Sequence, residues 1–290
     1  MLFFPPLFFG LEVHYTEIAP HRISIMLTSP KNSRIQHIRK LQRSARARRQ
    51  AGAFIVEGVR LVEEALAANW QPELVIYTQD LSTRGKANVD KFRSLGIPVL
   101  LVDMAVMRSV SDTQTPQGIL AVLPLPTWEV SAGLTFALVL DGVRDPGNLG
   151  TLLRTASAAG VEALFLPPGN VDAFSPKVVR AAMGAHFKLP IFTMEWENIR
   201  AHLAGLNIFL ADSAGGQPHF RARFDAPLAI IIGGEAAGAG ESAQNLATDR
   251  VHIPMPGDAE SLNAAVAGAV LMFEAVRQRA SELNAEEISA

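Results

Sequence analysis

Apolar and polar residues alternate along this chain with two periods, one typical of helices and one typical of strands. Residues 33–49 place apolar side chains three or four positions apart on one helical face, with basic residues elsewhere. That face consists of Ile35, Ile38, Leu41 and Ala45. Further on, the predicted strands are 53–56, 73–78, 97–102 and 118–123, and the predicted helices are 58–68, 86–95 and 104–110. This alternation predicts a small α/β domain.

A second alternating series begins after a segment that contains Pro and Gly but no apolar repeat. Its predicted strands are 135–140, 162–166, 189–192, 207–210, 228–232 and 251–254, and its predicted helices are 149–159, 175–183, 196–204 and 261–279. The run Leu228–Ile232 is apolar throughout, which is typical of a strand buried on both faces of a parallel sheet. In the last helix, we expect the core-facing residues to be Leu262, Val266, Val270 and Phe273.

These patterns divide the chain into an α/β domain at 26–123, a linker at 124–134 and a second α/β domain at 135–290. The first 25 residues fit poorly with the rest. Their apolar start contains two Pro residues, is too short to span a bilayer and lacks the cleavage site of a signal peptide. Met26 opens a more ordinary N-terminus. We therefore expect residues 1–25 to be a spurious or dispensable extension, and we expect no membrane partner.

The composition, 49% hydrophobic and 19% charged in 290 residues, is that of a chain that buries cores. Cysteine is absent, which excludes disulfides, thiolate nucleophiles and Cys-ligated metal sites and favours a cytoplasmic protein. The net charge of -2 hides a basic segment, because residues 31–50 contain eight Lys or Arg residues and no Asp or Glu. A solvated helix face fits this segment, but so many unopposed charges favour a polyanionic partner. The candidate contacts to that partner are Arg34, Arg39, Lys40 and Arg43.

Several familiar site motifs are absent. The glycine spacing before Asn148 is that of a phosphate-binding loop, but Asn stands where Lys is required. The segment Ala211–Gly215 lacks the first Gly of a nucleophile elbow, and a surface turn explains it better. His186 and His252 show no metal-ligand spacing, so we expect structural or surface roles for them.

Three strand–turn–helix junctions carry the remaining candidate chemistry. The first runs from Asp145 to Arg154, the second is Ile232–Glu235, and the third runs from Ile253 to Asn263. As single features, the second also fits a dinucleotide loop with the wrong glycine spacing, and the third fits simple helix capping. In a parallel sheet, however, all three junctions meet at one edge. The polar residues brought together there are Asn148, Arg154, Glu235, Ser261 and Asn263.

These three motifs, in this order, resemble the SpoU or TrmH-like family of the SPOUT class, which are RNA ribose 2′-O-methyltransferases. Residues 175–185 resemble the segment between the family's first two motifs. Residues 54–66 resemble its N-terminal RNA-binding domain, which is similar in fold to ribosomal protein L30e. The resemblance covers about residues 27–280. It departs from the family at Ala264–Ala265, where many members have Val–Ser.

The resemblance implies an α/β domain with a trefoil knot, a homodimer that completes each active site, and S-adenosylmethionine as cofactor without a metal. Residues that match its cofactor-binding positions are Gly233, Gly234, Ile253 and Leu262. Apolar walls and glycine turns also suit an adenine ring on physical grounds.

The resemblance also implies roles for the polar residues. Arg154 acts either as the base or as a clamp on phosphate and the developing oxyanion. A guanidinium with a pKa above about 12 is a difficult base, which favours the clamp. Asn148 and Glu235 position the loops around Arg154, and Ser261 and Asn263 orient substrate or cofactor. Ribosomal RNA is favoured over transfer RNA by analogy alone. An NAD(P)-binding enzyme that uses residues 233–240 and a non-catalytic RNA-binding protein remain alternatives.

Overall fold

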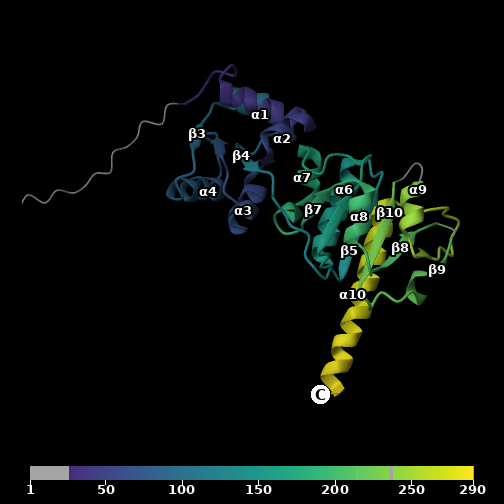
Figure 1. Ribbon diagram of the computed structural model, residues 1–290. Coiled ribbons are helices and arrows are strands. Elements are labelled where there is room, and N and C mark those ends of the chain that lie inside the picture. The colour runs from purple at the N-terminus through teal and green to yellow at the C-terminus, as the bar shows by residue number, and fades with distance from the viewer. Residues whose placement is uncertain (1–25, 214, 235–237, 290) are drawn as a thin grey trace, which may run out of the picture.

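The computed structural model describes residues 26–213, 215–234 and 238–289, with side chains as far as residue 280. The prediction for residues 1–25 and the site residue Glu235 therefore lie outside the described residues. Within the described part, the chain forms two sheets, each with its own helices (Figure 1).

The first sheet has the strand order β1-β4-β2-β3, with β4 antiparallel to β1 and β2, and β2 parallel to β3. Helices α1 and α5 contribute to the core on one face, and helices α3 and α4 to the core on the other. The elements are α1 (Ser33–Arg43), α2 (Ala45–Ala51), β1 (Ala53–Glu57), α3 (Val59–Ala67), β2 (Leu74–Tyr77), α4 (Thr83–Ser94), β3 (Val99–Leu101), α5 (Met104–Val110) and β4 (Ile119–Pro124).

The basic segment forms two helices, where the periodicity predicts one. Ser44 has an extended backbone, with φ -132° and ψ 115°, and its Oγ accepts a hydrogen bond of 3.1 Å from the backbone N of Ala47. Serine favours this N-cap position over a helix interior because its hydroxyl satisfies a free N–H of the new helix. Of the predicted face, Ile35, Ile38 and Leu41 are buried, as expected.

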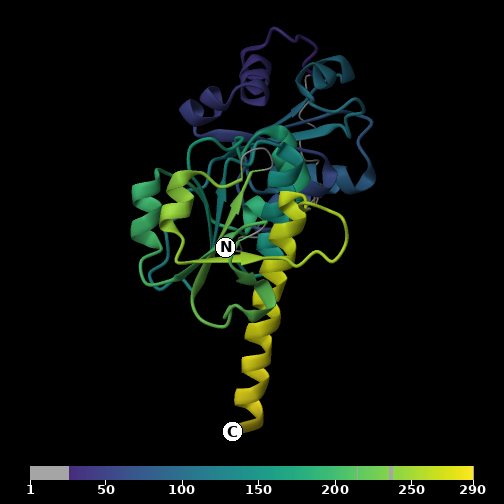
Figure 2. The ribbon, with the colours of Figure 1, turned by 90° about the vertical axis from the view of Figure 1, so that its right-hand side faces the viewer.

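The second sheet has seven strands in the order β7-β6-β5-β10-β8-β11-β9, and all its pairs are parallel. Its central strands are buried on both faces, which confirms the predicted parallel α/β fold class. Helices α6, α7 and α10 cover one face, and α8 and α9 cover the other (Figure 2). The elements are β5 (Phe136–Asp141), α6 (Pro146–Ala158), β6 (Ala163–Leu166), α7 (Pro176–Ala182), η1 (Ala185–Phe187), β7 (Ile191–Thr193), α8 (Trp196–His202), β8 (Asn207–Ala211), β9 (Gln217–Pro218), η2 (His219–Arg221), β10 (Leu228–Gly233), α9 (Glu241–Leu246), β11 (Asp249–His252) and α10 (Ala264–Ser289).

The position of β11 requires the chain to cross itself. Strand β11 lies between β8 and β9, two strands that precede it in the chain, and Gly216, just before β9, lies against β11. At Gly216, with φ +77°, a Cβ would lie 1.9 Å from the carbonyl oxygen of Arg250. Only glycine permits so close a crossing. This insertion agrees with the threaded fold that the resemblance implies.

Helix α10 buries a different face from the predicted one. Leu262, Val266 and Phe273 are 37%, 49% and 49% exposed, so their assignment to the core is wrong, and Val270 is only half-buried. The helix packs against α6 so closely that a Cβ on Gly268 would lie 2.5 Å from Leu152. Small side chains allow this approach, whereas the periodicity argument weighs only hydrophobicity. The buried residues of α10 are Ala264, Ala265, Leu271, Met272 and Ala275.

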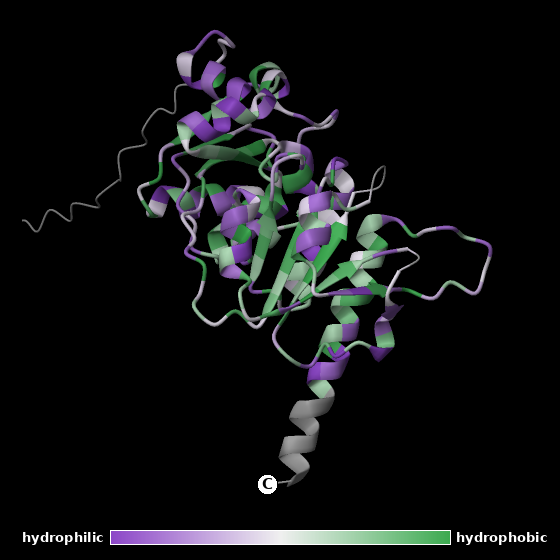
Figure 3. Ribbon diagram, turned by 45° about the vertical axis from the view of Figure 1, so that its right-hand side comes forward, coloured by the Kyte–Doolittle hydropathy of each residue, from purple (hydrophilic) through white to green (hydrophobic). Residues whose placement is uncertain are grey.

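Beyond the sheet, α10 projects away from the body of the molecule (Figures 1 and 2). Hydrophobic residues concentrate in the strands of both sheets, while the outer surfaces of the helices are mixed or hydrophilic (Figure 3).

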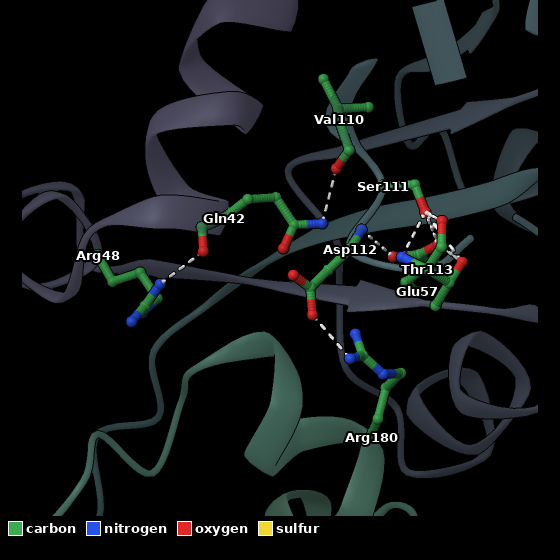
Figure 4. A network of polar contacts seen from close by, with 8 residues as sticks. All are labelled: Gln42, Arg48, Glu57, Val110, Ser111, Asp112, Thr113 and Arg180. Carbon is green, nitrogen blue, oxygen red and sulfur yellow. Dashed lines mark hydrogen bonds and ion pairs between the residues drawn. The ribbon is translucent and has the colours of Figure 1, made fainter. Parts of the chain in front are cut away.

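The two α/β units pack directly against each other. Arg48 of α2 is 4% exposed and donates to Asp172, which follows β6, at 2.5 and 2.9 Å. Arg180 of α7 pairs with Asp112 at 2.7 Å (Figure 4). The rings of Phe54 and Phe174 meet at a centroid distance of 5.1 Å. The basic helices are therefore fixed to the edge where the parallel strands end.

His186 lies buried in this contact, and its Nε2 is 2.7 Å from the carbonyl oxygen of Ala173. Burial lowers the pKa of its imidazole to about 4, so the ring is neutral at pH 7.

Candidate functional site

A cavity of about 250 Å³ lies where three of the parallel strands and helix α10 meet. Its walls come from the ends of β8, β10 and β11 and from the first turns of α10 with the residues before them. Most of the lining side chains are apolar, and several positions are glycine. The described lining residues are Ala211, Asp212, Ser213, Ile232, Gly233, Gly234, Gly238, Val251, Ile253, Met255, Ser261, Leu262, Ala264, Ala267 and Leu271.

The turn after β10 needs glycine because two backbones touch there. A Cβ on Gly234 would lie 2.1 Å from the carbonyl oxygen of Gly142, and one on Gly233 would lie 2.5 Å from the backbone N of Ala239. The backbone N of Gly234 donates to the Asp141 carbonyl at 2.8 Å. The turn after β10 is thus pressed onto the turn after β5. Gly233 and Gly234, predicted to bind the cofactor, both line the cavity.

Helix α6 begins at the first junction. The Asp145 carboxylate caps it by accepting a hydrogen bond of 2.8 Å from the backbone N of Asn148. The Nδ2 of Asn263 donates to Oδ1 of Asn148 at 3.0 Å. The first and third motifs, 115 residues apart, are therefore joined side chain to side chain.

The third junction forms one wall of the cavity and also caps helix α10. Ile253, Ser261 and Leu262 line the cavity. Asn263 does not line it; its Oδ1 caps α10 by accepting from the backbone N of Ala265 at 2.9 Å and of Val266 at 3.3 Å. The predicted helix start at Ser261 is therefore three residues early. The capping role and the link to Asn148 coexist because the two ends of one amide serve different partners.

The structure does not bring Arg154 to the cavity of its own chain. Arg154 is exposed on α6 and makes no hydrogen bond or ion pair with the described residues. It follows Asn148 by six positions, which places it about 120° around the helix and about 9 Å along it. Arg154 is thus not among the residues that line the cavity of its own chain, and its place in the site stays a prediction.

Two polar residues of the cavity are not among the predicted site residues. Asp212 and Ser213 belong to the Ala211–Gly215 segment, which the sequence pattern assigns to a surface turn. Oδ2 of Asp212 accepts from Nη1 of Arg250 at 3.0 Å. The signal in the sequence is a polar pair directly after an apolar strand, which is the same signal that locates the other junctions.

The basic helix offers fewer free charges than its sequence suggests. Arg48 is buried against Asp172, and Arg39 donates to the carbonyl oxygen and Oγ of Ser109 at 3.3 and 2.9 Å. Arg34, Lys40 and Arg43 are exposed and have no ion pair within the described part of the chain. These three residues remain the accessible candidates for phosphate contacts.

The described residues offer neither a metal site nor a membrane span. No group of three or more His, Asp or Glu residues among them is arranged to hold a metal ion. No helix in the same part of the chain is long and apolar enough to cross a membrane.

Comparison with known proteins gives the class. Residues 135–273 match the SpoU rRNA Methylase family, and residues 32–121 match the MRM3-like substrate binding domain. The 23S rRNA (guanosine(2553)-2'-O)-methyltransferase RlmP of Bacillus subtilis is 32% identical over 249 residues, covering 85% of this chain and 97% of that protein. The SpoU methyltransferase AviRb from Streptomyces viridochromogenes, solved in complex with AdoMet, has a TM-score of 0.76 at 29% identity, covering 86% of this chain and 100% of that chain. An AdoMet-bound rRNA methyltransferase from Sinorhizobium meliloti has a TM-score of 0.77 at 30% identity, covering 87% of this chain and 97% of that chain.

The fold and the joined motifs thus define a methyltransferase of the SPOUT class. The chain belongs to the SpoU rRNA methylase family. The family resemblance carried by the three motifs is confirmed.

Proposed function

We propose that this chain transfers a methyl group from S-adenosylmethionine to a ribose 2′-hydroxyl of ribosomal RNA. Its family membership supports the reaction and the cofactor, and the names of its relatives support ribosomal over transfer RNA. The observation that carries the proposal is the hydrogen bond of 3.0 Å between Asn263 and Asn148. This bond joins the first and third motifs beside a cavity that the second motif closes.

The cavity residues fit S-adenosylmethionine. Ile232, Val251 and Ile253 provide apolar walls for adenine, and the glycine turn leaves backbone groups accessible where side chains are absent. Gly233, Gly234, Ile253 and Leu262 would hold the cofactor there. When bound, S-adenosylmethionine supplies an electrophilic methyl group on a positively charged sulfur.

The nucleophile is the harder part of the reaction. A ribose hydroxyl attacks only as its proton is removed or strongly hydrogen-bonded. Arg154 binds the adjacent phosphate, whose oxygen accepts the hydroxyl proton, and stabilises the developing oxyanion, since a guanidinium is a poor base. Asn148 and Asn263 hold the two loops together, and Ser261 orients a ligand in the cavity.

A second copy of the chain supplies Arg154 to the cavity. Helix α10 exposes Val266 and Phe273, which lie seven positions apart on one face, and Leu262 precedes them. Such an apolar stripe on a helix that otherwise packs closely against α6 is typical of a subunit interface. The homodimer therefore buries the stripe and brings α6 of one protomer toward the cavity of the other.

The N-terminal unit binds RNA through Arg34, Lys40 and Arg43. These side chains contact phosphates, which position the strand without reading its sequence. The contact between Arg48 and Asp172 fixes this surface relative to the strand edge that carries the cavity. The cytoplasmic location expected from the absence of cysteine stays a prediction.

The test is methyl transfer by the purified full chain. Ribosomal and transfer RNA transcripts are incubated with S-adenosylmethionine labelled in its methyl group, and modified nucleotides are located by mass spectrometry. We expect a 2′-O-methyl nucleotide in ribosomal RNA alone. Label in transfer RNA would assign the other substrate, and RNA binding without transfer would support a non-catalytic binder. Calorimetry that compares the binding of NAD with that of S-adenosylmethionine tests the alternative of an NAD(P)-binding enzyme.

A further inference from the structure

Asp212 is the one charged side chain among the described residues that line the cavity. It follows β8, which lies between β10 and β11 in the sheet. The ends of these two neighbouring strands form the walls on either side of it. The Asp212 side chain is 26% exposed, so its carboxylate stays accessible to a ligand within a mostly apolar and glycine-rich lining.

The carboxylate is held in a fixed position. Its Oδ2 accepts from Nη1 of Arg250 at 3.0 Å, and a Cβ on Gly215 would lie 2.8 Å from the same oxygen. Arg250 is itself pressed against Gly216 at the chain crossing, and its Nη2 lies 3.4 Å from Oε1 of Gln244. The contacts of Asp212 with Arg250 and Gly215 thus orient its carboxylate before any ligand arrives.

The pairing with Arg250 also selects the kind of group that Asp212 can bind. A nearby guanidinium balances the carboxylate charge, which weakens its attraction for a further cation such as the sulfonium or the amino group. Its oxygens still act as acceptors, since an ionised carboxylate can accept about four hydrogen bonds. Neutral donors placed side by side, such as two vicinal hydroxyls, suit this arrangement best.

We propose that Asp212 accepts hydrogen bonds from the ribose 2′- and 3′-hydroxyls of S-adenosylmethionine, with Arg250 as its positioning residue. The inference rests on the proposed placement of the cofactor in this cavity. A carboxylate at the end of a parallel strand binds ribose hydroxyls in the same way in dinucleotide-binding folds. The apolar walls then receive adenine, and the ribose contact sets where the sulfur lies.

The experiment compares the affinities of two proteins for two ligands by titration calorimetry on the full chain. The ligands are S-adenosylhomocysteine and its 2′,3′-dideoxy analogue, and the proteins are the parent and Asp212→Asn. We expect Asp212→Asn to bind S-adenosylhomocysteine about 10- to 100-fold more weakly, since hydrogen bonds to a charged group are lost. The analogue should bind both proteins with similar, weak affinity, because the hydroxyls and the carboxylate act as one unit.

Equal loss of affinity for both ligands in Asp212→Asn would show that Asp212 acts elsewhere, and the inference would be wrong. The parent protein alone provides an independent test: if it binds the two ligands equally, the hydroxyls have no partner. Asp249→Asn is the matched control, because this exposed carboxylate adjoins Arg250 but does not line the cavity. We expect that control to change affinity less than about twofold.

Ala267→Phe, which fills the cavity, separates this inference from the proposed function. If Ala267→Phe abolishes binding while Asp212→Asn leaves it unchanged, the cavity holds the cofactor but Asp212 does not contact ribose. If Ala267→Phe leaves binding unchanged, the cofactor lies elsewhere and this inference fails, while the methyl-transfer assay still decides the proposed reaction.

Discussion

The cavity and the outer face of α6 differ in how completely a single chain builds them. Around the cavity, backbone segments touch at Gly234 and Gly216, and the Asn148 and Asn263 side chains are joined. On α6, Arg154 is exposed and has no partner within the described residues. One chain therefore completes the cavity by itself, whereas the role proposed for Arg154 requires a bound substrate and a second copy of the chain. Mutations in the two regions should have separable effects on binding and on catalysis.

The largest effect is expected at the cavity, where backbone segments touch. Gly234→Val places side-chain atoms where the carbonyl of Gly142 lies, so the turns after β5 and β10 must separate. We expect the free energy of unfolding to fall by about 1–3 kcal/mol and S-adenosylmethionine binding to be lost. Chemical denaturation and calorimetry measure both. Gly257→Val is the control, because open space surrounds Gly257. Binding within twofold of the parent in Gly234→Val would contradict the tight junction.

Arg154→Ala should separate catalysis from binding. We expect the rate of methyl transfer to fall about 100- to 1,000-fold, as for loss of an oxyanion-stabilising donor, with cofactor affinity unchanged. Arg200→Ala, an exposed arginine on the opposite face of the sheet, should retain activity. Activity of Arg154→Ala within tenfold of the parent would remove this residue from the mechanism.

Mixing the two inactive variants decides which subunit provides the arginine. A dimer of one Arg154→Ala chain and one Gly234→Val chain keeps an intact cavity in the first and an intact Arg154 in the second. We expect activity to reappear after mixing and subunit exchange if Arg154 acts across the interface. Continued inactivity of verified mixed dimers would place Arg154 in its own chain's site.

A charge on the exposed stripe of α10 should give the next largest effect. Phe273→Asp puts a carboxylate on the exposed surface that the proposed homodimer would bury, so the protein should sediment as a monomer and lose most of its activity. Leu95→Asp changes an equally exposed apolar residue on the N-terminal unit and should leave the oligomeric state unaltered. Sedimentation velocity distinguishes these outcomes. A dimer that survives Phe273→Asp would locate the interface elsewhere.

The smallest effect is expected at the basic helix. The double variant Lys40→Glu/Arg43→Glu should weaken RNA binding and reduce the slope of log affinity against log salt by about 1.4–1.8, because two phosphate contacts are lost. Lys86→Glu/Lys91→Glu on α4 makes the same change of charge on another surface. If both double variants lower the slope equally, net charge alone explains the binding.

Much of this architecture could be predicted from the sequence because strands and helices alternate with clear periods. Leu228–Ile232 is apolar throughout and occupies a central, doubly buried position. The helix breaks at Ser44 because the serine side chain caps the following helix. The hydrophobic period alone predicts one continuous helix there. The buried face of α10 depended on helix–helix distance at Gly268, which a count of hydrophobic residues does not measure.

The sequence predicts those cavity residues that lie in the junctions after β10 and β11. It does not predict those whose position depends on the order of the strands in the sheet. Gly233, Gly234, Ile253, Ser261 and Leu262 all line the cavity. Asp212 and Ser213 also follow a strand end, but the insertion of β11 beside β8 is what makes their strand a cavity wall. Strand order is a long-range property, and neighbouring residues in the sequence do not encode it.

The crossing at Gly216 also constrains the timing of folding during synthesis. Strand β11 takes its place between β8 and β9 only after both have left the ribosome, and α10 closes the last wall later still. A nascent chain therefore has no complete cavity at the proposed cofactor site until its C-terminal helix emerges. An enzyme that modifies ribosomal RNA would then be inactive for almost the whole of its own translation.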